Sequence, residues 1–205
     1  MKMNRIEKLA MNNPIRALIQ RYYETPLLER LGGRVEGMHV LEIGCGRGVG
    51  TEIIFKHFGA REIHSFDIDP DMVKKARKRL SNYSSERLNL RVGDATAIDA
   101  EDKSFDAVFD FWIIHHIPDW QVAVSEIKRV LKPGGRLFFQ EVTSKALNRL
   151  FYRLFLEHPK ENRFSKQDFV AELERHGIVV GDNVVERFFG DFIFGVGHCT
   201  KEVQK

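Results

Sequence analysis

One stretch decides the fold, and it reads Val40-Leu41-Glu42-Ile43-Gly44-Cys45-Gly46-Arg47-Gly48-Val49-Gly50. Its first half is a short apolar run, which is typical of a buried strand. The glycines that follow let the main chain turn sharply and approach a ligand without Cβ clashes. A helix is expected from about residue 48, and its N-terminus adds free N–H groups and a positive dipole end. The stretch therefore predicts a strand, a loop and a helix that suit a carboxylate- or phosphate-bearing ligand.

Outward from this unit, apolar runs alternate with helical patterns. Strands are predicted at 38–43, 62–67, 88–92, 105–111 and 136–141, with helices between them. Two β-rich stretches, 178–189 and 192–196, close the chain and bring the strands to seven. Strands separated by helices of about ten to fifteen residues predict an α/β fold. We expect a doubly wound, mostly parallel seven-stranded sheet with helices on both faces.

Several helix boundaries follow from short motifs. Asn13 and Asp69 each precede a proline, so both are interpreted as N-caps with the proline in the first helical turn. Asp119 is expected to cap the helix that follows it, and Ser165-Lys166-Gln167-Asp168 to open another as a capping box. The pair Thr25-Pro26 is expected to break the N-terminal helix.

Composition excludes several classes of protein. The chain has 205 residues, 43% hydrophobic and 30% charged, with a net charge of +3, which suits one ordinary globular domain and not a disordered or disulfide-built chain. No apolar run spans a bilayer and no secretory signal is visible, so a cytoplasmic location is expected. Cys45 and Cys199 form no metal-ligand spacing, so no metal is expected. The 16 phenylalanines predict either a thick core or an apolar pocket.

The glycine loop does not fit a dinucleotide site. The pattern GxGxxG needs a third glycine at position 49 or 51, and the chain has Val49 and Thr51 there. What stands is Glu42-x-Gly44-x-Gly46-x-Gly48, which resembles the first motif of class I S-adenosylmethionine-dependent methyltransferases of the small-molecule type. The alternative is a strand, turn and helix with incidental glycines.

Four further positions carry the same resemblance, which covers about residues 38–141. Asp67 ends the second predicted strand, where a carboxylate can accept two hydrogen bonds from a ribose diol. Gly93-Asp94-Ala95 follows the third strand, where the family's acidic residue contacts the adenine amino group, although Asp94 can also be a plain loop residue. His115-His116 follows the fourth strand, and Lys132-Pro133-Gly134-Gly135 precedes the fifth.

The resemblance implies a Rossmann-like methyltransferase fold with S-adenosyl-L-methionine as cofactor. It also implies the cofactor-binding residues, which are Glu42, Gly44, Cys45, Gly46, Gly48, Asp67, Ile68, Asp94, Ala95 and Phe111. Residues 1–35 are then expected to be a helical extension that covers the cofactor or substrate, and residues 36–205 the methyltransferase domain. Tyr22 or Tyr23 can touch the cofactor from that extension, or Tyr22 can be buried against the core.

The implied chemistry is direct, in-line transfer of a methyl group from a sulfonium to a nucleophile. Orientation of the reactants alone can contribute on the order of 7–11 kcal/mol. His115 is the candidate base for a hydroxyl or thiol acceptor, because imidazole titrates near physiological pH. The alternative is that His115 and His116 are hydrogen-bonded structural residues at the end of the strand.

The expected acceptor is a small molecule, which can be partly apolar. Nucleic acid is not expected, because Asp110-Phe111-Trp112-Ile113 replaces the motif of amino-methylating enzymes and no basic patch is present. The alternatives are a membrane lipid or quinone-like acceptor, a cofactor-binding module without catalysis, and a nicotinamide-dependent oxidoreductase. Membrane contact is not favoured, and the oligomeric state is not predicted. The apolar face over 145–156 is interpreted as a lid, an interfacial helix or a helix packed on the sheet.

Overall fold

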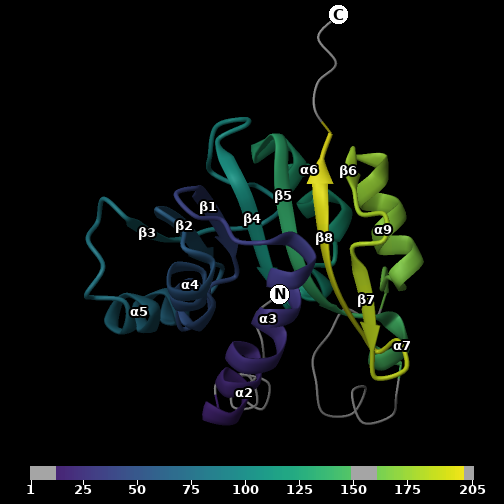
Figure 1. Ribbon diagram of the computed structural model, residues 1–205, viewed down its shortest axis with the longest axis horizontal. Helices are drawn as coiled ribbons and strands as arrows, with labels where there is room; N and C mark the ends of the chain where they lie inside the picture. The colour runs from purple at the N-terminus through teal and green to yellow at the C-terminus, as the bar shows by residue number, and fades with distance from the viewer. Residues whose placement is uncertain (1–12, 149–160, 201–205) are drawn as a thin grey trace, which may run out of the picture.

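The computed structural model of the chain describes residues 13–148 and 161–200. Its centre is a sheet with the order β3-β2-β1-β4-β5-β8-β6, and β7 also pairs with β8 (Figure 1). The strands are β1 His39–Ile43, β2 Glu62–Asp67, β3 Leu88–Val92, β4 Phe105–Phe111, β5 Leu131–Val142, β6 Ile178–Val179, β7 Val184–Arg187 and β8 Phe192–Cys199. The first five strands pair in parallel and β8 runs antiparallel to β5. The predicted doubly wound, mostly parallel sheet is confirmed.

The sequence predicts seven strands, and the described residues form eight. The difference lies at one edge, where β6 pairs with His198 and Cys199 of β8 while β7 pairs with residues 192–195 of the same strand. The other edge of β8 is taken by β5. Gly181, in a left-handed conformation with φ +53°, turns the chain between β6 and β7. Two short strands therefore share the seventh position end to end.

Helices cover both faces of the sheet. They are α2 Pro14–Ile19, η1 Gln20–Glu24, α3 Thr25–Gly32, α4 Val49–Ile53, η2 Ile54–Phe58, α5 Pro70–Arg79, η3 Ile114–His116, α6 Trp120–Val130, α7 Ser144–Leu147 and α9 Lys166–Arg175. Leu28 of α3 and Phe58 of η2 belong to one apolar cluster, and Ile127 of α6 and Phe169 of α9 belong to another. None of the helices in the described residues is long and apolar enough to cross a membrane.

Most predicted caps form, and one does not. Asn13 accepts a hydrogen bond from the Arg16 N–H, Asp69 accepts one from the Asp71 N–H, and Ser165 and Asp168 form a reciprocal capping box. Asp119 precedes α6, but its side chain makes no capping hydrogen bond. Its backbone, at φ −99° and ψ 53°, is not extended as a capping residue requires.

The predicted break at Thr25-Pro26 is wrong. The helical path continues from α2 through the π-helical turn η1 into α3. Within this turn the Thr25 N–H donates to the Gln20 carbonyl, and the Thr25 hydroxyl donates to the same oxygen at 2.7 Å. After this wider turn a new α-helix, α3, begins at Thr25. Pro26 therefore lies in its first turn, where a backbone N–H has no partner within the helix and its absence costs no hydrogen bond.

Phenylalanines supply the largest fully buried side chains of the core. Phe109 of β4 stacks on Phe138 of β5 with ring centroids 4.4 Å apart, and Phe58 meets both rings edge-on. Fully burying a side chain of this size stabilises a fold by about 1.5–3 kcal/mol. Other fully buried rings are Phe105, Phe139, Phe169 and Phe194. The thick-core explanation of the phenylalanine content therefore holds for these residues.

The predicted helix over 145–156 lies largely outside the described residues. Only its start is described, as α7, with Ala146 and Leu147 buried. The first twelve residues of the predicted extension 1–35 also lie outside them.

Candidate functional site

The site lies where the strand order reverses. β1 is followed along the chain by β2 on one side, and β4 lies on its other side. In open parallel sheets, ligands bind at the carboxyl ends of the strands at such a point. Here the ends of β1, β2 and β4 and the loop after β3 contribute Gly44, Asp67, Ile113 and Gly93 to a first pocket. A second pocket lies against it and shares Gly44 and Asp67.

The glycine loop after β1 forms the floor of both pockets. The φ angles of Gly44, Gly46 and Gly48 are +69°, +52° and +84°. Residues other than glycine rarely adopt this left-handed region. A Cβ on Gly44 would lie 2.3 Å from Ile113 Cγ1, whereas a Cβ on Gly46 would meet no atom within 4 Å. Packing against Ile113 therefore leaves no room for a side chain at position 44. Gly46, which lines the second pocket, has free space beside its Cα.

Glu42 lies under this loop. Its side chain accepts hydrogen bonds from the Thr51 hydroxyl at 2.5 Å and the Ser65 hydroxyl at 2.6 Å. Burial raises the pKa of Glu42 to about 7, against the lowering effect of the two hydroxyls. Glu42 lines the second pocket, so a cationic ligand group there would meet a carboxyl that titrates near neutral pH.

Asp67 joins the end of β2 to the glycine loop. Its two carboxylate oxygens accept hydrogen bonds from the Gly46 and Asp69 N–H groups, each at 2.8 Å. The residue is 7% exposed and lines both pockets. A carboxylate held in this way is fixed in orientation at the point where both pockets meet.

The N-terminal helix closes the second pocket. Ala17 of α2 and Gln20 of η1 line it opposite Gly46. Glu24 anchors this segment, because it accepts a hydrogen bond from Trp112 Nε1 at 3.3 Å and pairs with Arg16 at 2.9 Å. Burial raises the pKa of Glu24, and Arg16 opposes that rise.

Trp112, which also lines the second pocket, was missed as a site residue at the sequence level. Its φ is +69°, a strained backbone conformation for a bulky residue. No sequence pattern distinguishes this tryptophan from a core residue, because its conformation results from the contacts around it.

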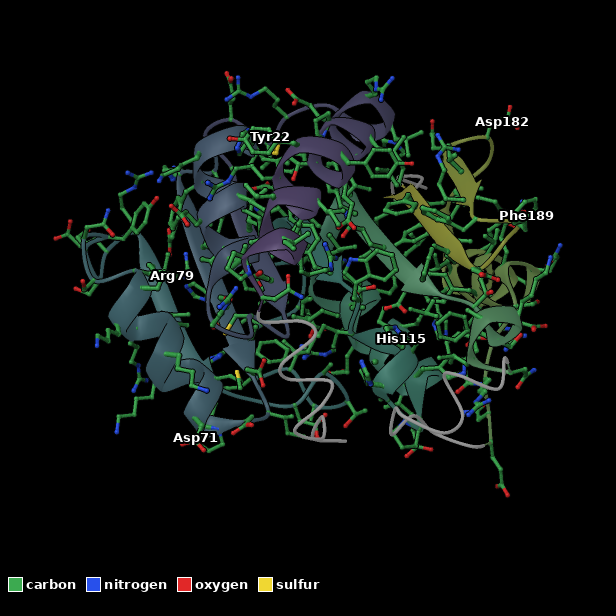
Figure 2. The ribbon with its side chains drawn as sticks, turned by 90° about the horizontal axis from the view of Figure 1, so that it is seen from below. Tyr22, Asp71, Arg79, His115, Asp182 and Phe189 are labelled. Atoms are coloured by element: carbon green, nitrogen blue, oxygen red, sulfur yellow. The ribbon has the colours of Figure 1, made fainter. Side chains whose placement is uncertain are left out.

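The two tyrosines of the extension lie outside both pockets. Tyr22 is 70% exposed and lies at the periphery of the molecule (Figure 2). Its predicted burial against the core is therefore wrong, because the side of the helix that faces the site carries Ala17, Gln20 and Glu24. Tyr23 is 45% exposed, and its hydroxyl accepts a hydrogen bond from Arg187 Nε at 3.1 Å.

His115 and His116 face different surroundings. His115, labelled in Figure 2, is 6% exposed. Its Nδ1 contacts the buried Glu141 carboxylate. Glu141 also accepts hydrogen bonds from the Ile114 N–H at 2.6 Å and the His115 N–H at 3.2 Å. His116, in contrast, lines the first pocket beside Ile113 and Ile117, and His115 is not among the lining residues.

The structure brings together most residues that the sequence suggests for cofactor binding. The first pocket contains Gly44, Asp67, Ile68, Asp94 and Ala95, and the second contains Glu42, Cys45, Gly46 and Phe111. Gly48 lines neither; it is the N-cap of α4, and a Cβ there would lie 2.8 Å from Leu80 Cδ1. The Cys45 thiol is buried, and this burial raises its pKa, so it is not a reactive nucleophile.

The buried carboxyls of the site predict a pH-dependent stability. Burial raises the pKa of Glu42 and Glu141 to about 7, and burial next to Glu141 raises that of Asp110 well above its usual value. The folded protein then holds protons that the unfolded chain releases, so Glu42 and Glu141 each lower the free energy of unfolding as pH rises from about 4.5 to about 7, and Asp110 acts in the same direction.

We expect the Glu42→Gln variant to lose about 3 kcal/mol less unfolding free energy than the wild type over this pH range. The number follows from the pKa of Glu42, which burial raises from 4.5 to about 7. Urea unfolding between pH 4.5 and 8 measures it as the difference between the wild-type and variant profiles. Glu174→Gln, at an exposed position of α9, is the control and should keep the wild-type slope. Parallel profiles for wild type and Glu42→Gln would contradict the prediction.

Sheet order, glycine loop and the carboxylates at the strand ends define a class I methyltransferase fold. Residues 41–139 match the family model described as a methyltransferase domain. The fold agrees with that of a solved S-adenosylmethionine-dependent methyltransferase from Aquifex aeolicus, with a TM-score of 0.73, 24% identity and coverage of 96% of this chain and 98% of that one.

Curated relatives agree with this class. The chain is 35% identical over 111 residues to phosphoethanolamine N-methyltransferase 2 of Caenorhabditis elegans, covering 54% of this chain and 25% of that protein. It is 31% identical over 138 residues to demethylmenaquinone methyltransferase of Staphylococcus aureus, covering 67% of this chain and 56% of that protein. The matched part of the chain therefore covers between a quarter and just over half of the length of these relatives. Residues 41–139 thus resemble a methyltransferase domain, in the fold of the class I S-adenosylmethionine-dependent methyltransferases, whose cofactor is S-adenosyl-L-methionine.

Proposed function

We propose that this protein transfers a methyl group from S-adenosylmethionine to a small acceptor by direct in-line displacement. The observation that carries the proposal is the double pocket at the carboxyl ends of the strands, in which the open Gly46 and the carboxylate of Asp67 lie side by side. A Cβ at position 46 would fill space that a ligand needs, so the cradle fits a ligand that approaches the main chain closely.

Each pocket suits one half of the cofactor. In the first, Asp67 would accept hydrogen bonds from the ribose hydroxyls, while Ile68, Asp94 and Ala95 would contact the adenine. In the second, Glu42 would face the amino group of the methionine part, with the rest of the loop and Phe111 around it. Gly48 would act indirectly, by allowing the turn into α4.

When bound, the sulfonium supplies an already activated methyl group. The task of the protein is therefore to orient the acceptor and to exclude water, which can supply much of the rate enhancement without a covalent enzyme intermediate. The N-terminal helical segment would contribute to both orienting the acceptor and excluding water, because its residues Ala17 and Gln20 line the second pocket. This supports the proposed role of residues 1–35 as a cover.

For the acceptor side, we propose His116 in place of His115 as the imidazole that faces the acceptor. Within the first pocket, His116, Ile113 and Ile117 all come from the segment after β4, whereas the residues assigned to the adenine come from the loops after β2 and β3; the β4 segment suits a partly apolar acceptor with one polar reacting group. His115 would then position this turn through Glu141. If a base is used, His116→Ala should lower turnover up to about 100-fold and change cofactor affinity much less.

His115→Ala provides the comparison for this prediction. It should lower the free energy of unfolding, since it removes a partner of the buried Glu141, and change turnover less than His116→Ala does. Single-turnover kinetics and calorimetric cofactor titration of both variants measure the split. A larger loss of turnover in His115→Ala at unchanged stability would restore His115 as the base.

A lipid or quinone-like acceptor is the second candidate. It is favoured by the exposed apolar side chains of α2, where Ile15, Leu18 and Ile19 are 69%, 53% and 45% exposed next to the second pocket. Such a row can lie in a membrane interface. Flotation with anionic and neutral vesicles distinguishes the candidates, because an acceptor drawn from a membrane predicts co-flotation that Leu18→Ser weakens.

Calorimetric titration tests the proposed function itself. S-adenosylmethionine and its demethylated product should each bind one site per chain, and NAD should not bind. The release of demethylated product is then measured with phosphoethanolamine and demethylmenaquinone, the acceptors in the names of two relatives, and with extracts of small metabolites. Cofactor binding without product from any acceptor would favour a non-catalytic binding module, and no binding would refute the proposal.

A further inference from the structure

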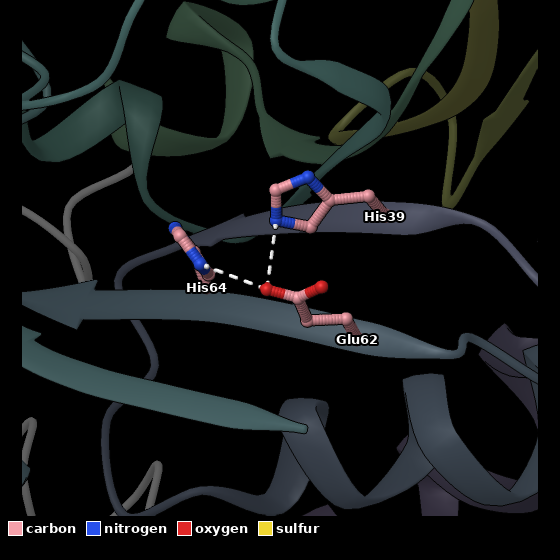
Figure 3. A group of neighbouring side chains, drawn as sticks. All are labelled: His39, Glu62 and His64. Carbon is pink, nitrogen blue, oxygen red and sulfur yellow. Dashed lines mark ion pairs between the residues drawn. The ribbon is translucent and has the colours of Figure 1, made fainter. Parts of the chain in front are cut away.

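A second cluster of chemically active side chains lies at the opposite end of the sheet. His39 is the first residue of β1 and Glu62 the first residue of β2, while the glycine loop and Asp67 lie at the other ends of these strands. The parallel register places His39 beside Glu62 and Leu41 beside His64. Because alternate residues of a strand share a face, His39, Glu62 and His64 point to the same side of the sheet (Figure 3).

The three side chains converge on one carboxylate oxygen. Glu62 Oε1 lies 3.5 Å from His39 Nε2 and 3.3 Å from His64 Nε2, and all three atoms lie within 4.8 Å of one another (Figure 3). Both contacts are longer than an ordinary hydrogen bond of about 2.7–3.2 Å. They match the edge of a tetrahedron around a metal with ligand bonds of about 2.0–2.1 Å, which is about 3.3–3.4 Å.

The surroundings hold the imidazoles in place and leave one side open. The Phe105 ring packs against both, with centroids 4.6 Å from His39 and 5.4 Å from His64. His39 Nε2 is buried and makes no hydrogen bond within the described residues. The side chains of His39, Glu62 and His64 keep 19%, 32% and 24% of their surface exposed, so water can reach a fourth ligand position.

The charges around the cluster are compatible with a cation. Burial and the neighbouring His39 lower the pKa of His64, which favours the uncharged form of the imidazole, the form that binds metals. Arg91 is the opposing positive charge, but it is paired with Asp99 at 2.9 Å. Asp106, which accepts a hydrogen bond from the His39 N–H at 2.9 Å, adds a nearby negative charge that Lys132 balances.

We propose that His39, Glu62 and His64 bind one zinc ion, with water as the fourth ligand, and that this ion ties β1 to β2. Two imidazoles and one carboxylate are a ligand set that suits Zn²⁺ and related divalent transition metals, and not Mg²⁺ or Ca²⁺. The site is remote from the cofactor pockets, so it stabilises the sheet and takes no part in methyl transfer. It is independent of the proposed function.

Metal titration of the tag-free, chelator-stripped protein tests the proposal. Competition with a chromophoric chelator should show one Zn²⁺ per chain, and Co²⁺ should give the visible absorption of a tetrahedral site. His39→Gln and His64→Gln should each weaken Zn²⁺ binding at least about tenfold, because each removes a ligand. Zn²⁺ at about 100 times its Kd should raise the Tm of the wild type by roughly 5–10 °C.

His176→Gln is the matched control, since His176, which directly follows α9, also contacts a carboxylate, Glu172, at 3.1 Å but has no third ligand in the described residues. This variant should bind Zn²⁺ as the wild type does. Glu62→Gln replaces either histidine variant that does not fold in the presence of chelator. Absence of saturable Zn²⁺ binding, or equal affinity in the ligand variants and the control, would overturn the proposal; cofactor titration of the same proteins keeps this outcome separate from the fate of the methyltransferase assignment.

Discussion

Replacing Gly46 by alanine is expected to lower the affinity for S-adenosylmethionine at least about 100-fold while the protein still folds. The added methyl group meets no protein atom within 4 Å, so it does not clash with the apo protein. Because Gly46 lines the second pocket, we expect the methyl group to take space that the proposed cofactor needs there, and displacement of about 1 Å in such a site can cost about 100-fold. The positive φ of +52° adds a backbone cost of about 1 kcal/mol to the stability.

Gly37→Ala separates the two effects. Gly37 also has a positive φ, +71°, and also has no atom within 4 Å of an added Cβ, but it lies in the loop before β1 and lines neither pocket. Both variants should therefore lose similar stability in urea unfolding, and only Gly46→Ala should lose binding in calorimetry. Equal cofactor affinity in the two variants would remove the glycine loop from the cofactor site.

Glu141→Ala is expected to be the most destabilising change in the site, at about 3–5 kcal/mol. The carboxylate has no exposed surface, and it accepts hydrogen bonds from the N–H groups of Ile114, His115 and Val142 as well as contacting the His115 ring. Truncation leaves these buried donors without an acceptor and opens a cavity. The turn that carries His115 and His116 should loosen as a consequence.

Urea unfolding and hydrogen exchange measure this effect. Glu141→Gln keeps the size of the side chain and one oxygen acceptor, so its loss should be smaller than that of Glu141→Ala. Glu174→Ala, at an exposed position, should change the stability by less than about 0.5 kcal/mol. A loss below about 1 kcal/mol in Glu141→Ala would show that water or a rearranged turn satisfies the donors.

Short sequence motifs predicted most of the helix caps, turns and strand ends that surround the site. Asn13 and Asp69 act as caps because the capping bond joins residues two or three positions apart. The glycine loop could be predicted in the same way, since residues 44–48 carry the glycines that its positive φ angles require. Asp67 and Asp94 are site residues by the family resemblance, which places acidic residues at the end of the second strand and after the third, and the carboxyl ends of parallel strands lie at one edge of the sheet.

The predictions that the structure overturned have two different causes. Thr25-Pro26 fails as a break because the π-helical turn before it shifts the hydrogen-bond pairing, a local feature that residue propensities alone do not indicate. Tyr22 is exposed because Glu24, held by Trp112 from the end of β4, fixes which side of the helix faces the site. In this second case a local propensity competes with packing that the local sequence does not contain.

The sequence by itself therefore determined the α/β architecture, the glycine loop and the carboxylates around it, because strand period, turns and caps are encoded within a few residues of each other. Tertiary structure alone decided which of two adjacent histidines reaches the pocket, how an N-terminal helix closes it, and that His39, Glu62 and His64 meet. These features depend on strand register and on the orientation of side chains at element ends, which are fixed only when elements far apart in the chain pack together.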